Sequence, residues 1–116
     1  MKFICLVYAV PGALSGLSAE EKDALDRDSL AYDRELEAKG HFLAASALQA
    51  VSTASTIRVR GGGVLVSDGP FAETREVLCG FIFIKAGDMD EAKRIAAGIP
   101  MARHGSIEVR PELDFG

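Results

Sequence analysis

The sequence predicts a single α+β domain, because long apolar strand-like runs alternate with two helices that carry clear start signals. The runs are Phe3–Ala9 and Phe81–Lys85, and the start signals are Ser-Ala-Glu-Glu from Ser18 and Asp-Met-Asp-Glu from Asp88. We interpret the element order as β-α-β-β-β-α-β, with an antiparallel sheet and both helices on one of its faces. Helices separated by strand pairs in this way are typical of a ferredoxin-like fold.

Length and composition fit one domain that spans residues 1–116. The chain has room for one core, and its 48% apolar and 26% charged residues are typical of a globular protein. The net charge is −4, and 13 basic residues are scattered among 17 acidic ones. Phosphate binding needs clustered Lys and Arg, so we do not expect nucleic acid as a direct partner.

The apolar start of the chain is interpreted as a strand. Met1–Val10 is apolar apart from Lys2, but a Pro-Gly pair and a polar helix follow where a signal peptide would continue. No apolar run approaches the roughly 18 residues that span a bilayer. We therefore expect a cytoplasmic protein that does not bind a membrane.

The first helix is expected from a cap at Ser18 to about Lys39. The Ser18 hydroxyl can accept from the amide of Glu21 while the Glu21 side chain reaches back, and Gly40 supplies the stop. Its apolar stripe includes Leu25, Tyr32 and Leu36.

Strands are expected on both sides of a triple glycine at 61–63. Thr56–Arg60 and Val64–Ser67 form a hairpin around it, and His41–Leu48 is a strand before them. The triple glycine does not resemble a phosphate loop, because no helix and no Lys-Ser/Thr follow it. The stretch Asp68–Gly80 is predicted to be irregular or only briefly helical.

The second helix and a last strand complete the domain. Asp88 begins the helix, and Gly98 and Pro100 end it. Ser106–Arg110 is the last strand, with Ile107 and Val109 on the face opposite Glu108 and Arg110.

A homodimer follows from the two strands that are apolar on both faces. Phe3–Ala9 and Phe81–Ile84 have this pattern, yet two helices can cover only one face of a sheet. A second copy is the simplest cover for the other face, and two-fold dimers are the commonest oligomers.

The segment 68–76 carries a family resemblance. It reads Asp-Gly-Pro-Phe-Ala-Glu-Thr-Arg-Glu and is followed by Gly80. It closely resembles the signature Asp-Gly-Pro-Phe-Ala-Glu-Thr-Lys-Glu of DGPF-domain proteins within the YCII-related family. The tail at 104–111, His-Gly-Ser-Ile-Glu-Val-Arg-Pro, resembles the segment with which such proteins end, and the element order agrees over essentially the whole chain.

The resemblance implies a ferredoxin-like fold and a homodimer whose sheets face each other in a barrel-like arrangement. It implies a small enzyme or a ligand-binding role without naming a reaction, and members occur beside extracytoplasmic-function sigma factors. YCII proteins proper look as though they use a His on the first helix paired with an Asp. The matching place here is about Ser29, and the helix contains no His, so that dyad does not carry over.

Asp68 is the first candidate catalytic residue, and its position in the sequence allows two interpretations. It can close a turn with Gly69, accepting from its own downstream backbone, or it can stand at the rim of the sheet as a general base or ligand anchor. Phe71 is expected to pin the loop as a hydrophobic peg. Glu73, Thr74 and Arg75 are candidate ligand-binding residues of a polar cleft, with solvated surface as the rival interpretation.

Glu108 and Arg110 are further ligand-binding candidates, on a strand expected inside the sheet. They form a structural ion pair or line a polar cavity between subunits, where Arg58 and Arg60 could help to hold a small anion. His104, in the turn before that strand, is the second candidate catalytic residue.

No metal or cofactor is predicted, because no Cys, His and carboxylate spacing is typical of a metal site. Cys5 and Cys79 are interpreted as small buried hydrophobes.

Three functions remain open from the sequence. The first is a dimeric small-molecule-binding protein, either a binding protein only or an enzyme that performs acid–base chemistry with Asp68 and His104 or Glu73. The second is a regulatory module that binds a protein partner such as a sigma factor. The third is a motif that serves folding and dimerisation alone.

Overall fold

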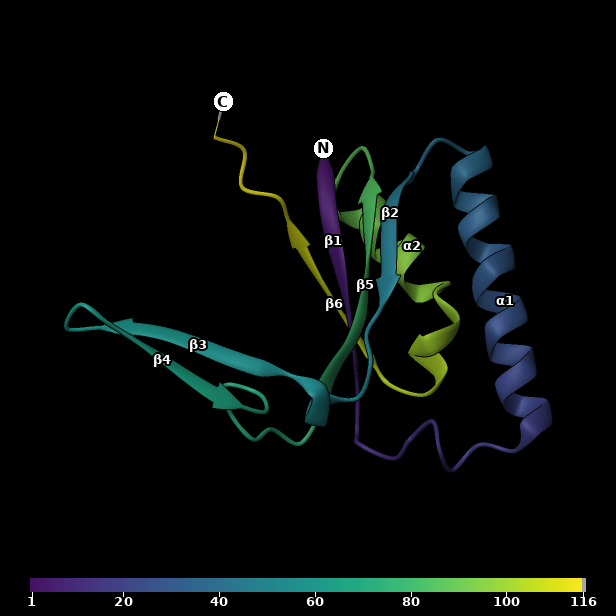
Figure 1. Ribbon diagram of the computed structural model, residues 1–116. Helices are drawn as coiled ribbons and strands as arrows, with labels where there is room; N and C mark the ends of the chain where they lie inside the picture. The colour runs from purple at the N-terminus through teal and green to yellow at the C-terminus, as the bar shows by residue number, and fades with distance from the viewer. Residues whose placement is uncertain (116) are drawn as a thin grey trace.

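The protein forms a four-stranded sheet with both helices on one side and a hairpin that stands away from it. Figure 1 shows the computed structural model, which describes residues 1–115. The elements run in this order: β1 Lys2–Ala9, α1 Ala19–Ala38, β2 Phe42–Ala47, β3 Ser55–Arg60, β4 Gly63–Asp68, β5 Val77–Lys85, α2 Met89–Ala97 and β6 Ser106–Pro111. Two short 3-10 turns, η1 Val51–Thr53 and η2 Pro100–Arg103, complete the chain.

The α+β class is confirmed, and three details of the prediction are corrected. Four strands separate the helices, so the order β-α-β-β-β-α-β is one strand short, although each of the four was expected individually from the sequence. Strand β5 already begins at Val77, inside the stretch predicted to be irregular. Strand β6 lies at the edge of the sheet rather than inside it, because the strand order is β2-β5-β1-β6.

The core lies between the sheet and the helices. Phe3, Cys5 and Ile84 are fully buried and pack with Leu36 of α1 and Ile95 of α2. On β1, side chains alternate between buried and half-buried, so one face of this strand meets the helices and the other does not. Figure 1 shows both helices on the same side of the sheet.

Both helices begin at the residues that the sequence indicates. Ser18 and Glu21 form the reciprocal capping box, with Glu21 N donating to Ser18 Oγ over 3.1 Å and Ser18 N donating to Glu21 Oε1 over 3.0 Å. These bonds lower the pKa of the Glu21 carboxyl. Asp88 caps α2 by accepting from the amide of Glu91 over 2.8 Å.

The register of β5 depends on a glycine that lets two strands approach closely. Gly80 is buried and pairs with Val7 of β1 and Ala47 of β2. A Cβ atom at this position would come within 2.5 Å of the Ser46 carbonyl oxygen. Only glycine therefore fits here without moving the backbone of β2.

We predict that Gly80→Ala destabilises the protein by about 1–3 kcal/mol, because the added methyl group forces β2 away from β5. Gly63→Ala is the matched control, since a Cβ at Gly63 meets its nearest atom at an ordinary 3.5 Å. Urea unfolding should place the control within about 0.5 kcal/mol of wild type. Equal stability of the two variants would contradict the close approach.

Candidate ligand-binding pocket

A cavity of about 640 Å³ lies between the N-terminal half of α1 and the strands beneath it. We call it the α1 pocket. The loop after β1 forms one wall, and the segment from β2 to η1 and the start of η2 form others. Its lining includes Val7, Ala9, Leu14, Leu25, Asp26, Ser29, Asp33, Ala45, Ala47, Leu48, Gln49, Cys79, Gly80, Pro100 and Met101.

The pocket exists because the residues around it are too small to fill the space. Ala45, Ala47 and Gly80 lie on the helix side of β2 and β5, as their pairing with one another and with Ile82 shows. Across from them, α1 presents Ser29 one turn after the buried Leu25. A core normally packs to the density of an organic crystal, so an unfilled region of this size marks a place where a ligand can bind.

The other half of α1 is packed in the ordinary way. Leu36 is 3% exposed, and the Tyr32 hydroxyl donates to the Ile95 carbonyl over 2.6 Å. Burial, with a smaller effect from Glu35, raises the pKa of Tyr32, so the hydroxyl stays protonated as a donor. This contact holds α1 against α2 and leaves the pocket at the opposite end of α1.

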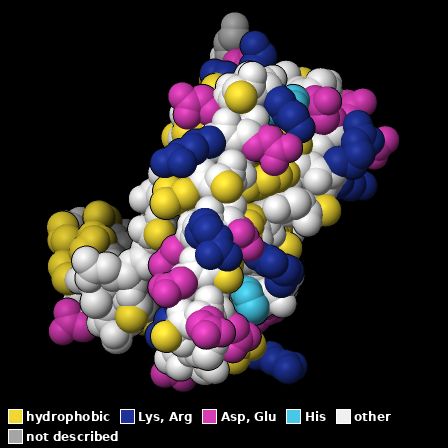
Figure 2. Space-filling model, turned by 90° about the vertical axis from the view of Figure 1, so that its right-hand side faces the viewer, with side chains coloured by type: hydrophobic (Ala, Val, Ile, Leu, Met, Phe, Trp, Pro, Cys, Tyr) yellow, Lys and Arg dark blue, Asp and Glu magenta, His cyan; other side chains and the backbone are white. Residues whose placement is uncertain are grey.

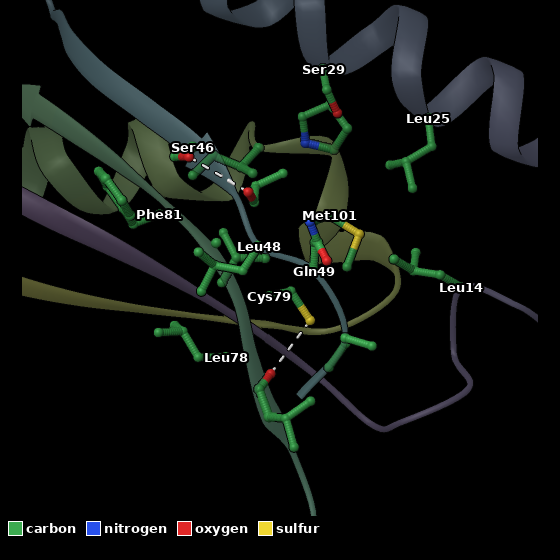
Figure 3. A pocket seen from close by; sticks show the side chains of 18 of the residues that line it. Leu14, Leu25, Ser29, Ser46, Leu48, Gln49, Leu78, Cys79, Phe81 and Met101 are labelled. Carbon is green, nitrogen blue, oxygen red and sulfur yellow. Dashed lines mark hydrogen bonds between the residues drawn. The ribbon is translucent and has the colours of Figure 1, made fainter. Parts of the chain in front are cut away.

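Figure 3 shows how the polar and sulfur-containing side chains enter the pocket. Ser29 and Leu25 point from α1 toward the strands, and Met101, Gln49 and Cys79 lie below them. Two carboxylates of α1, those of Asp26 and Asp33, also line the cavity. The lining is thus mainly apolar with a few polar groups that can orient a ligand.

Asp33 is a titratable group of the pocket that is partly shielded from water. Burial raises the pKa of its carboxyl above the ordinary value of 3.8. Among residues 1–115 no hydrogen bond or ion pair of this side chain is present to favour its charged form. The carboxyl therefore holds its proton to a higher pH than a fully solvated aspartate does.

Cys79 reaches the pocket through a β-bulge. Val7 and Tyr8 of β1 pair with Gly80 and Leu78 of β5, so Cys79 between them has no partner on β1. Bulges redirect side chains, and the Cys79 thiol lies 3.4 Å from the carbonyl oxygen of Val77. Burial raises the pKa of Cys79, offset in part by a hydrogen bond from the Ala9 backbone, so the thiol stays protonated.

The DGPF loop, residues 68–76, lies outside the α1 pocket. Asp68 ends β4 and is exposed, and Gly69 makes the turn with a φ of 94°. The Gly69 amide donates to Ala54 O over 2.7 Å, and Thr56 Oγ1 donates to Gly69 O over 2.9 Å. Within residues 1–115 the Asp68 carboxylate accepts no bond from its downstream backbone, so the turn is held by the main chain instead.

Most of the other residues of this loop are also exposed. Thr74 Oγ1 donates to Glu76 O over 2.6 Å, and Glu73 and Arg75 extend into solvent. Phe71 is 74% exposed, so the expectation that it pins the loop within this chain is wrong. Glu76 is half-buried, and its carboxylate accepts from Ser106 Oγ over 3.0 Å, which ties the loop to the start of β6.

The remaining candidates lie on or beside β6. Arg110 and Glu108 pair with each other over 3.3 Å on the face of β6 away from the helices, whereas Ile107 and Val109 pack toward the core. His104 is half-buried at the end of η2, where its amide donates to Met101 O over 2.9 Å. None of the seven residues predicted from the sequence lines the α1 pocket.

The surface carries no broad region of one charge on the side of α1. Figure 2 shows acidic and basic side chains interspersed there. None of the helices in residues 1–115 is long and apolar enough to cross a membrane. Within the same residues no three His, Cys, Asp or Glu side chains are grouped so that they could hold a metal ion.

Comparison with known proteins agrees with the resemblance in the sequence. The model of the YCII-related domain matches residues 1–116. The chain belongs to the YCII-related family. It is also similar to an uncharacterized protein of Rhizobium meliloti (strain 1021), with 36% identity over 113 residues that cover 96% of this chain and 91% of the relative.

Ser29 gives the pocket of this YCII-related protein a hydroxyl that points from α1 toward the strands. Asp33, one turn further along α1, also lines the pocket.

Sequence reasoning missed Asp33 and Cys79. The signal for Asp33 was available, because it falls on the same side of α1 as Leu25 and Ser29 at a spacing of four residues. No signal could have found Cys79, since its direction depends on a bulge that only the pairing of β1 and β5 reveals.

We predict that the Asp33 carboxyl titrates above its ordinary pKa. Because burial favours the neutral form, this group contributes stability at low pH, and the contribution is lost as pH rises through its folded-state pKa. Side-chain ¹³C NMR from pH 3 to 8 measures the titration, and Asp33→Asn assigns the resonance. A midpoint at or below 3.8 would contradict the buried position of this carboxyl.

Proposed function

We propose that this YCII-related protein binds a small, mainly apolar molecule in the α1 pocket and works as a homodimer. The observation that carries the proposal is the unfilled volume of about 640 Å³ beneath α1. Small-molecule sites are typically concave, mostly apolar and a few hundred to about 1,000 Å³ in volume. The α1 pocket meets each of these conditions within one chain.

The polar groups of the pocket favour a ligand with a hydrogen-bond donor or a positive charge. Asp26 and Asp33 supply acceptors, and Ser29 can donate or accept. A small anion is disfavoured here, because the two carboxylates would repel it. If the protein is an enzyme, Asp33 is the group that would exchange a proton with the bound molecule, since burial raises its pKa.

The fold supports a ferredoxin-like assignment and the dimer that accompanies it in the family. Without the hairpin β3–β4, the order of elements along the chain is β-α-β-β-α-β. In the sheet, β1 and β5 lie at the centre and β2 and β6 lie at the edges. The side chains of Leu6 and Phe81 lie opposite each other on the face away from the helices. A second copy whose sheet faces this one would cover them in a barrel-like arrangement.

A second candidate site lies on the uncovered side of the sheet, and the bond between Glu76 and Ser106 favours it. This bond joins the DGPF loop to β6, so Asp68, Glu73, Thr74, Arg75 and Glu76 belong to the same region as the strand that carries Glu108 and Arg110. A small anion could bind there through Arg110 between two subunits. The regulatory alternative, in which a sigma factor is the partner, rests on the family resemblance alone and ranks below both sites.

We predict that Ser29→Leu weakens ligand binding while the protein stays folded, because the leucine side chain narrows the pocket and removes its hydroxyl. A screen of small amines, alcohols and carboxylates by thermal melting first finds a ligand, which at ~100 times its Kd adds about 2.7 kcal/mol and several degrees of melting temperature. Arg27→Leu is the matched control, since its side chain is 73% exposed on the same helix. If the ligand raises the melting temperature of Ser29→Leu as much as that of wild type, the result contradicts the proposal.

We predict that Asp68→Asn changes the free energy of unfolding by less than about 0.5 kcal/mol, because the carboxylate is exposed and makes no bond to hold the turn. Urea unfolding measures this directly. A loss above about 1 kcal/mol would instead make the DGPF loop mainly a folding device. Loss of binding of a small carboxylate in Asp68→Asn, with Ser29→Leu unaffected, would move the site to the second candidate.

A further inference from the structure

Asp33 places a carboxylate on the stripe of α1 that otherwise faces the core. Leu25, Ser29 and Asp33 follow one another at a spacing of four residues, and Leu36 comes three residues later. Leu25 and Leu36 are buried, whereas Asp33 is half-buried. Within residues 1–115 no hydrogen bond or ion pair holds its carboxylate. Taking a carboxylate out of water without a partner costs free energy, so this group is suited to a partner that the chain itself does not supply.

The charges around the α1 pocket fix the sign of that partner. Its titratable lining residues are Asp26, Asp33 and Cys79, and no Lys, Arg or His of residues 1–115 lines it. Burial raises the pKa of the Cys79 thiol, which therefore stays neutral. Arg103, the basic residue of η2, pairs with Asp28 over 3.2 Å. A bound cation would thus meet only carboxylates, whereas a bound anion would find no opposite charge in the lining.

The size and composition of the pocket require that the partner also has an apolar part. The cavity of about 640 Å³ is far larger than an ammonium group needs. Figure 3 shows Leu48, Cys79 and Met101 on the side of the pocket opposite α1. The unbranched side chain of Met101 can adapt to ligands of different shape. The charged end of a ligand would therefore lie at the helix and its hydrocarbon part against the strands and η2.

We propose that the α1 pocket binds a protonated amine with an apolar body, its ammonium group on the Asp33 carboxylate and the Ser29 hydroxyl. The proposal rests on the ligand-binding function proposed above and names the class of ligand. A hydrogen bond between two charged groups is roughly twice as strong as one between neutral groups, and partial shielding from water strengthens it. Asp26 also lines the pocket but is exposed, so water and salt screen its charge.

The first test compares hexylamine, 1-hexanol and hexanoate, which share a chain and differ in the head group. Hexylamine is charged at pH 7, because alkyl amines titrate near 10.4, as Lys does. Chemical shifts of the pocket methyl groups, followed by NMR during titration, give the Kd of each compound. We expect hexylamine to bind wild type about tenfold or more tightly than 1-hexanol, and hexanoate to bind more weakly than both. Butylamine should bind more weakly than hexylamine, by about two- to fourfold for each methylene removed.

The second test assigns the preference for an amine to one carboxylate. Asp33→Asn should reduce the preference for hexylamine over 1-hexanol to less than about threefold, while the Kd of 1-hexanol changes by less than about twofold. Asp23→Asn is the matched control, because Asp23 is exposed on the same helix, does not line the pocket and loses the same charge. The control should keep the preference of wild type.

A measurement on wild type alone covers the case in which Asp33→Asn does not fold. Burial raises the pKa of the Asp33 carboxyl, and an ammonium group beside it favours the charged form. Saturation with hexylamine should therefore move the titration of the Asp33 carboxyl carbon to lower pH. Saturation with 1-hexanol, which brings no charge, should not.

Three results would overturn the proposal. They are 1-hexanol that binds as tightly as hexylamine, equal loss of the preference in Asp33→Asn and Asp23→Asn, and an Asp33 titration that hexylamine leaves in place. The first of these contradicts the class of ligand and leaves the pocket as a binding site. If none of the three compounds binds wild type and the pocket methyl groups do not respond, the result contradicts both this inference and the function proposed for the pocket.

Discussion

The structure depends on one constraint: two helices cover a single face of a sheet whose central strands are apolar on both faces. On the helix side, Phe3, Cys5 and Ile84 are fully buried. On the other side, Leu6 and Phe81 are only half-buried. One chain therefore completes one core and leaves apolar side chains partly exposed on the other face of the sheet. The projecting hairpin also leaves valines exposed, and burial of such apolar surface is favourable.

The α1 pocket arises on the covered face, where the same core is left incomplete at one end. Large side chains fill the space beneath the C-terminal half of α1, and Tyr32 fixes the helix to α2 through the Ile95 carbonyl. Beneath the N-terminal half, alanines and Gly80 on the strands meet Ser29 on the helix. Filling this volume would add stability, as burial of a leucine side chain is worth about 1.5–3 kcal/mol. A protein that leaves it unfilled and places Asp33 beside it has an arrangement suited to binding.

Local signals in the sequence identified the elements but not their neighbours. Ser18 and Asp88 marked both helix starts, because capping depends on residues within one turn. The edge position of β6 and the start of β5 at Val77 depend on pairing between distant strands, which no local pattern encodes. The candidate site shows the same difference between local and long-range information. The nine-residue signature identified the family and drew attention to the DGPF loop, whereas the pocket is formed by residues from five separate segments.

Xenon tests, without a known ligand, whether the space beneath α1 is an accessible apolar cavity. Xenon enters apolar cavities and shifts the NMR signals of the groups that line them. Under a few atmospheres of xenon, the methyl signals of Leu25, Leu48 and Met101 should shift in wild type and shift less in Ser29→Leu, while Ile84, in the packed core, should not respond in either protein. No shift at the pocket methyls, or equal shifts at Ile84, would contradict the cavity and the function proposed for it.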